Sequence, residues 1–136
     1  MVDLAILYGD QGRYDDAEEL LLDALETLRR TLGDRDPRTI VMMNNVAWFL
    51  LSTREPAKPA EALALAREAS ELTDHGDPSV LDTLALALHR TGDTEQAIEI
   101  QTRAIALVPP EDEALRAELE EALARFEAAA AGDADG

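Results

Sequence analysis

The side chains that could do chemistry in this 136-residue chain are few and far apart. One of its two histidines is His75, within the run Asp-His-Gly-Asp at residues 74–77, and the other is His89, which precedes Arg90. The first run carries atoms able to bind a metal, but a turn followed by a helix N-cap explains them, and a closed site needs more ligands. The chain has no cysteine, which excludes disulfides, thiolate metal sites and cysteine nucleophiles.

No combination of residues predicts catalysis. The chain lacks a glycine-rich phosphate-binding loop, its histidines fall on separate elements, and its serines have no base at a suggestive spacing. Acid-base chemistry needs two carboxylates held in a cleft with separated pKa values, whereas the many carboxylates here lie on solvated helix faces. We therefore expect no enzyme, no cofactor and no metal.

The charge of the chain restricts its partners. A formal net charge of −17 would repel both nucleic acid and anionic membrane surfaces, so we expect neither as a partner. Solubility is the ordinary reason for such acidity, and a basic partner is the alternative. The N-terminus lacks the basic and apolar regions of a signal peptide, and no run reaches the roughly 18 apolar residues that span a bilayer. We expect a cytoplasmic protein.

The stretch with the clearest binding potential is the run Met-Asn-Asn-Val-Ala-Trp-Phe-Leu-Leu at residues 43–51. Helical spacing places two apolar stripes on it, rotated by about 100° from each other. The first comprises Met43, Val46, Ala47 and Leu50, and the second Val41, Asn44, Trp48 and Leu51. A helix that is apolar on two faces is packed on both, or packed on one and offered to a partner on the other. The second stripe is thus our candidate binding surface.

The elements around this stretch are predicted to be helices. A helix should run from Asp36 to about Leu51, between two helical hairpins, and end at a break over residues 52–59 that carries two prolines. Asp36-Pro37 and Asp77-Pro78 each place an N-cap aspartate before a proline at the first helical position. Small residues recur seven apart in the second helix of each hairpin, where an alanine lets two helix backbones approach closely; these are Ala17/Ala24, Ala62/Ala69 and Ala97/Ala104.

These features resemble the tetratricopeptide repeat family, whose unit is a helix-turn-helix of about 34 residues. The matching positions are Tyr8, Gly12, Tyr14, Ala17 and Ala24 in the first unit, and Leu84, Ala85, Leu88, Gly92, Ala97, Ala104 and Pro109 in the third. Residues 11–17 and 32–37 look like the repeats of kinesin light chains and their bacterial relatives. Residues 44–51 and the third unit look like repeats appended to bacterial Ser/Thr kinases and other signalling proteins.

The resemblance implies an all-α, right-handed solenoid over residues 1–127. Its three repeats would cover residues 1–36, 37–76 and 77–110, followed by a capping helix at 111–127 and a flexible tail at 128–136. Two departures stand out. The first repeat begins late, which suggests a fragment of a longer chain or a repeat completed by a neighbour. The segment 52–59 is longer than the usual turn between paired helices.

Members of the family usually bind a peptide in a concave groove lined by the first helix of each unit. Carried over position by position, the groove would comprise Val2, Ile6 and Asp10, then Val41, Asn44, Asn45, Trp48, Leu51 and Ser52, then Ser79, Asp82, Leu86, His89 and Arg90. Only Asn45 matches the clamp by which some members grip a terminal carboxylate, so we do not expect that mode of binding. An asparagine in the groove can still donate and accept along a peptide backbone.

Several groove residues also have a purely structural interpretation. Trp48 could pack against a neighbouring helix, Asn44 and Asn45 could hydrogen-bond between helices, and His89 with Arg90, facing Asp82, could be a solvated helix end. Two hypotheses follow for the whole protein. The first is an interaction module that binds a protein or peptide segment. The second is a structural piece of a longer solenoid that self-associates through its open N-terminal end.

Overall fold

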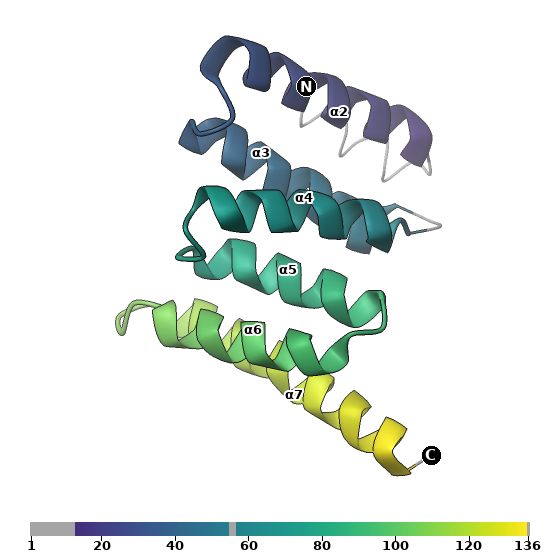
Figure 1. Ribbon diagram of the computed structural model, residues 1–136, viewed down its shortest axis with the longest axis vertical. Helices are drawn as coiled ribbons and strands as arrows, with labels where there is room; N and C mark the ends of the chain where they lie inside the picture. Colours follow the sequence, from purple (N-terminus) through teal and green to yellow (C-terminus); the bar gives the residue numbers. More distant parts are fainter. Residues whose placement is uncertain (1–12, 55–56, 136) are drawn as a thin grey trace.

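All the regular structure in the described residues is helical (Figure 1). The computed structural model describes residues 13–54 and 57–135, with the backbone alone for residues 133–135. The elements are α2 (Tyr14–Leu32), α3 (Pro37–Trp48), the π-helix η1 (Phe49–Thr53), α4 (Pro59–Leu72), α5 (Pro78–Arg90), α6 (Thr94–Leu107) and α7 (Glu113–Asp135). This confirms the predicted all-α class. None of these helices is long and apolar enough to cross a membrane.

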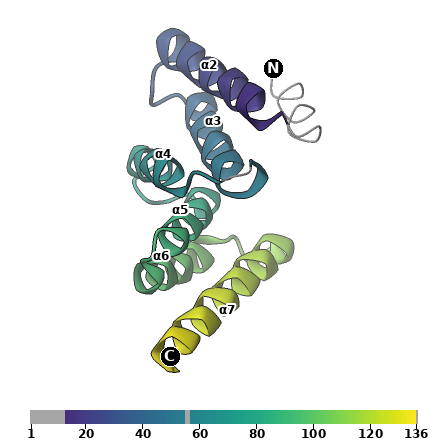
Figure 2. The same cartoon turned by 90° about the vertical axis from the view of Figure 1, so that its right-hand side faces the viewer.

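The helices stack in chain order, each packing on the one before it and the one after it. In Figure 1, α4 lies in front of α3 and α6 in front of α7. Figure 2, turned by 90°, shows α3 and most of α7 on the side of the molecule opposite α4 and α6. Helix α3 also contacts α5 directly. The stack is therefore a solenoid in two layers, with α3, α5 and α7 contributing to one side.

Local sequence signals begin the helices where they were predicted. The Asp36 carboxylate accepts a hydrogen bond from the backbone N–H of Arg38 at 2.9 Å, and Asp77 accepts one from the N–H of Ser79 at the same distance. Each aspartate precedes a proline at the first helical position, where the missing N–H costs nothing. The turn before α6 uses Gly92 with a φ of +99°, a backbone conformation that favours glycine.

The predicted core residues are buried. The first apolar stripe of α3 continues into η1, and its members are at most 2 % exposed. The six alanines spaced seven apart are all buried, Ala24 being the most exposed of them at 7 %. Because alanine adds little volume, the helices of neighbouring hairpins can approach closely at these positions.

The second helix pair departs from expectation at its centre. We expected one α-helix to continue to Leu51, but α3 ends at Trp48 and widens into η1. The backbone N–H of Arg54 donates to the carbonyl of Phe49 at 3.0 Å, the five-residue spacing of a π-helix. Three successive apolar residues, from Phe49 through Leu50 to Leu51, are all at most 6 % exposed. The widened turn fits the burial of this whole run.

The C-terminal helix is longer than predicted. Helix α7 begins at Glu113 and continues to Asp135, so the described backbone is helical where we expected a flexible tail at residues 128–136. The sequence explains the difference, since residues 128–131 are all alanine, which has the highest helix propensity.

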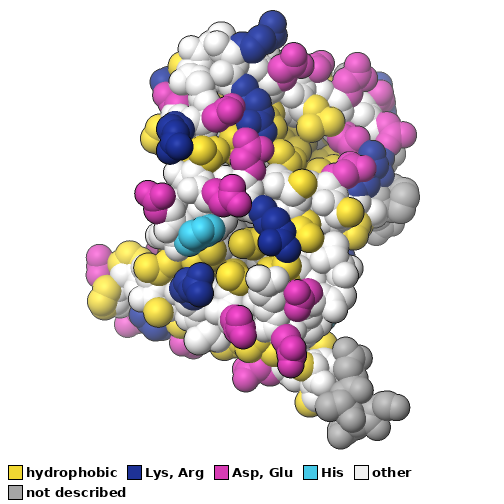
Figure 3. All heavy atoms as spheres, viewed as in Figure 1, with side chains coloured by type: hydrophobic (Ala, Val, Ile, Leu, Met, Phe, Trp, Pro, Cys, Tyr) yellow, Lys and Arg dark blue, Asp and Glu magenta, His cyan; other side chains and the backbone are white. Residues whose placement is uncertain are grey.

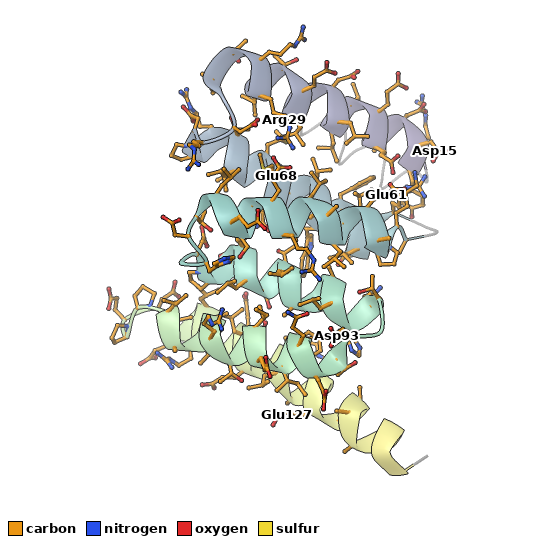
Figure 4. All side chains as sticks on the ribbon, viewed as in Figure 1. Asp15, Arg29, Glu61, Glu68, Asp93 and Glu127 are labelled. Carbon is orange, nitrogen blue, oxygen red and sulfur yellow. The ribbon has the colours of Figure 1, made fainter. Side chains whose placement is uncertain are left out.

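Ion pairs join α2 to the second repeat at both ends of α2. Arg29 of α2 donates two hydrogen bonds to Glu68 of α4, at 2.6 and 2.9 Å, and the two side chains point toward each other in Figure 4. These bonds raise the pKa of Arg29. At the other end of α2, the buried Arg54 lies 3.1 Å from Glu18, which Lys58 also contacts at 2.8 Å. Both clusters hold α2 against the second repeat.

Candidate functional site

A pocket of about 320 Å³ opens between α3, α5 and α7. Ten side chains line it: Trp48 from α3, then Asp82, Leu86, His89 and Arg90 from α5, then Glu118, Glu121, Ala122, Arg125 and Phe126 from α7. The helices come from different repeats, so the pocket exists only when the hairpins are stacked. Its volume lies at the small end of ligand pockets and suits one or two side chains.

Helix periodicity brings the α5 residues to one face. Asp82, Leu86 and His89 follow the i, i+4, i+7 spacing of a single helical stripe. Trp48 is the last residue of α3, immediately before the π-helix, and its side chain is 44 % exposed. A rigid aromatic ring therefore stands at the edge of the pocket with nearly half of its surface free.

Helix α7 supplies the opposite wall through a stripe of its own at three- and four-residue spacing. Phe126 is only 3 % exposed and forms part of the apolar base of the pocket. Its ring lies 5.0 Å from the ring of His89, centre to centre, with the planes tilted by 40°. The Nδ1 atom of His89 is in turn 3.0 Å from the Thr94 hydroxyl. These contacts fix the histidine ring between α5, α6 and α7.

Asp82 is the most unusual charged group of the site. Burial raises the pKa of its carboxyl group; a hydrogen bond from the Gln101 amide opposes the shift, Glu118 adds to it and Arg125 lowers the pKa. The Gln101 Nε2 atom donates to Asp82 at 2.9 Å and also to the carbonyl of Leu119 at 2.9 Å. Gln101 is fully buried, so it ties the floor of the pocket on α5 to the wall on α7.

Both arginines of the pocket are held by other groups. Arg90 donates from Nη1 to the carbonyl of Leu51, at the end of the π-helix, at 3.3 Å. Arg125 forms a salt bridge of 3.3 Å with Glu121, one turn earlier on α7. Across residues 13–54 and 57–135, the salt bridges do not include Asp82 or Glu118. The pocket thus combines an apolar base with carboxylates that lack a paired cation in this part of the chain.

The pocket gathers five of the fourteen groove residues predicted from sequence; Ser52 and Ser79 are exposed outside it. It contains Trp48, Asp82, Leu86, His89 and Arg90. The others lie elsewhere: Val41 and Asn45 are exposed on α3, Asn44 is half-buried, Leu51 is buried, and Ile6 lies outside the described residues. The N-terminal end at which we expected self-association also falls outside them, as do the predicted groove positions Val2 and Asp10.

The prediction for Leu51 has to be corrected. Its side chain is 2 % exposed and belongs to the core, so it cannot contact a partner. The helical stripe that placed it beside Trp48 assumed a continuous α-helix, whereas the π-helix widens the backbone between the two residues.

The α7 half of the pocket was not predicted as a site. Ala122 and Phe126 lie in the segment 111–127, which we predicted as a capping helix. The charged residues beside them, Glu118, Glu121 and Arg125, carried no signal of their own among many similar residues. Only the crossing of α7 over α5 brings them opposite Asp82. The described residues contain no group of three or more histidine, aspartate or glutamate side chains that could hold a metal.

The fold and the pocket define a class of protein: an α-solenoid of stacked hairpins with a recognition-sized cavity between repeats. Comparison with known families is more specific. A tetratricopeptide repeat family model matches residues 1–74, and a second tetratricopeptide repeat model matches residues 78–109. A search of curated proteins finds no significant match. The chain belongs to the tetratricopeptide repeat family, whose members are generally protein–protein interaction modules.

Proposed function

We propose that this protein binds a segment of another protein in the pocket between α3, α5 and α7, with Trp48 as the main contact. The observation that carries this proposal is the exposed Trp48 ring at the edge of a pocket lined by three helices. Tryptophan is enriched among the residues that dominate binding energy, because it offers a large rigid surface at low entropic cost. An apolar base formed with Leu86 and Phe126 provides area that a partner side chain can bury.

The segment would continue from the pocket along α3. Val41, Asn45 and Trp48 follow the i, i+4, i+7 spacing and are all exposed, Val41 at 58 %. An asparagine amide has both donors and acceptors and can bond the backbone of an extended chain. Asn44, beside this stripe, has a buried Oδ1 atom without a hydrogen-bond partner in the described part of the protein. Of these residues, the exposed Val41 and Asn45 offer the segment a second contact outside the pocket.

The test is a peptide library displayed on phage and selected against the wild-type protein, followed by calorimetric titration of the recovered peptides. Trp48→Ala should weaken binding by more than tenfold, because a central aromatic contact is worth about 2 kcal/mol or more. Leu22→Ala is the matched control, since Leu22 is a 43 % exposed apolar residue on α2 and does not line the pocket. Far-ultraviolet circular dichroism of each variant verifies that helicity is retained.

Equal binding by wild type and Trp48→Ala would refute the proposal. A selection that yields no binder, together with a mass in light scattering that rises with protein concentration, would favour the self-assembly hypothesis instead.

A further inference from the structure

The pocket has a charge pattern that selects among protein segments. On the face shown in Figure 3, acidic side chains are scattered among basic and apolar ones. The pocket of about 320 Å³ is lined by three carboxylates together with aromatic rings and two arginines; the carboxylates are those of Asp82, Glu118 and Glu121. The structure therefore places negative charge beside an apolar surface in a confined space, which is an arrangement that can distinguish one side chain from another.

The cations already present offset this charge only in part, since Arg125 lowers the pKa of Asp82 but forms no salt bridge with it in the described residues. Arg125 pairs with Glu121 at 3.3 Å, and Arg90 is bound to the carbonyl of Leu51. Asp82 has only a neutral partner in the described chain, the Gln101 amide at 2.9 Å. Burial raises the pKa of Asp82 and Glu118 adds to the shift, while the Gln101 hydrogen bond and the charge of Arg125 oppose it. The net rise makes the ionised form less favourable than it is in water. A cation entering the pocket would relieve that cost, and an anion would increase it.

We propose that the pocket accepts an arginine side chain of the bound segment, with its guanidinium group on Asp82 and Glu118 and its flat face against Trp48. This inference rests on the proposed function and names the chemistry of its ligand. Arginine fits better than lysine because its planar guanidinium bonds carboxylates through two parallel N–H groups and stacks on aromatic rings. Its three methylene groups match the apolar base near Leu86.

The net charge of the whole chain supports the same choice. At −17, the protein attracts basic segments from a distance and repels acidic ones. Attraction between exposed charges weakens as salt rises, since the screening length is about 8 Å at physiological ionic strength. Binding of an arginine-containing segment should therefore weaken between low and high salt, whereas insertion of an uncharged side chain should change little.

The experiment uses peptides recovered by selection against wild-type protein, each resynthesised with arginine, lysine, norleucine or glutamate at the position that contacts the pocket. Alanine scanning of the peptide identifies that position. Its replacement by alanine weakens binding to the wild-type protein more than any other replacement does, but weakens binding to Trp48→Ala little. Calorimetric titration measures the affinity of wild type and of every variant, including Trp48→Ala; in the proteins that keep Trp48, the only tryptophan in the chain, its fluorescence also reports binding. We expect arginine to bind at least about tenfold more tightly than norleucine, and glutamate to bind least.

Asp82→Asn and Glu118→Gln should each remove most of the preference for arginine over norleucine, while norleucine peptides keep their affinity. Asparagine still offers an oxygen to Gln101, so the fold around position 82 is retained. Glu120→Gln is the control, because Glu120 is exposed on the same helix and lies outside the pocket. A pocket position that favours norleucine or glutamate in wild type, or an arginine preference that survives Asp82→Asn, would overturn the inference.

The outcomes separate this inference from the function on which it rests. If the peptides bind Trp48→Ala more weakly than wild type but show no preference for arginine, the proposed binding site stands and the inference of an arginine ligand is refuted. Peptides whose affinity is indifferent to Trp48→Ala would refute both.

Discussion

Replacing Gln101 by leucine should weaken the connection between α5 and α7, which form the floor and the wall of the pocket. Gln101 is fully buried on α6 and donates two hydrogen bonds of 2.9 Å, one to the Asp82 carboxylate and one to the Leu119 carbonyl. Leucine has nearly the same volume and no donors. Substitution therefore removes both bonds without opening a large cavity, which isolates the polar contribution.

The expected loss of unfolding free energy is about 2 kcal/mol. A hydrogen bond to a charged group contributes about 1.5–3 kcal/mol and a neutral one about 1 kcal/mol. Part of this loss is offset, because the Gln101 Oε1 atom is buried with no hydrogen-bond partner among the described residues. Leucine removes this unpaired acceptor and its desolvation cost. For a chain of this length, a change of about 2 kcal/mol lowers the melting temperature by roughly 6 °C.

The size of the loss should depend on pH, because Gln101 bonds the carboxylate of Asp82. Since burial raises the pKa of Asp82, the native state binds more protons than the unfolded state between the two pKa values, and stability falls as pH rises through them. Below the unfolded pKa of about 3.9 the carboxyl is protonated in both states. Removing Gln101 raises the native pKa further, so Gln101→Leu should cost more at pH 7 than at pH 4.

Urea unfolding at pH 7 and pH 4, followed by circular dichroism and by the fluorescence of Trp48, measures both effects. Gln96→Leu is the control: Gln96 lies on the same helix, only partly buried, and the hydrogen bonds of the described residues do not involve its side chain. It should change stability by less than about 0.5 kcal/mol. A Gln101→Leu protein as stable as wild type, or a loss identical at the two pH values, would refute the reasoning.

Three further predictions concern the helices that support the site. Asp77→Ala should lower the unfolding free energy by about 1 kcal/mol and Asp77→Asn by much less, because only alanine abolishes the N-cap of α5; equal losses in urea titrations would contradict this. Met43→Ala should lower the unfolding free energy by about 2–5 kcal/mol, because it opens a cavity in the core. Val41→Ala, at a 58 % exposed position on the same helix, should lower it by less than about 0.5 kcal/mol. Similar losses in urea titrations of the two variants would show that α3 is packed on both faces. Hydrogen bonds from Arg38 lower the pKa of Asp36 in the native state. The stability that the Asp36 carboxylate contributes is therefore present above the unfolded pKa of about 3.9 and is lost as pH falls through the lower native pKa. An NMR titration that finds an ordinary pKa for this carboxyl group would contradict the prediction.

The parts of the fold that sequence could predict are those decided by short-range physics. The aspartate-proline pairs begin α3 and α5 because capping involves only the first helical turn. The alanines spaced seven apart are buried because helical periodicity fixes which residues share a face. On α5, Asp82, Leu86 and His89 were predicted from the family resemblance, and helical periodicity explains why they share one side.

The α7 half of the pocket depends on long-range geometry. Residues such as Glu118 and Arg125 join the site only because α7 packs on α6 and crosses near α5, and no spacing within α7 encodes that angle. The difference between the predicted place of Leu51 in the groove and its observed place in the core has a similar origin. A run of three apolar residues is compatible with either an α-helix or a π-helix, and burial against neighbouring helices decides between them.

The π-helix also determines what Arg90 can do in the pocket. The last carbonyls of a helix have no partner within it. The Leu51 carbonyl is instead bonded by the Arg90 guanidinium at 3.3 Å. An arginine that completes a helix terminus is less available to an acidic ligand than its position in the pocket suggests. The pocket is lined by three carboxylates and two arginines, a formal balance of minus one (two minus three). Because Arg125 pairs with Glu121, Asp82 and Glu118 are the carboxylates of the pocket without a salt bridge in the described residues, which is why a cationic side chain fits the site better than an anionic one.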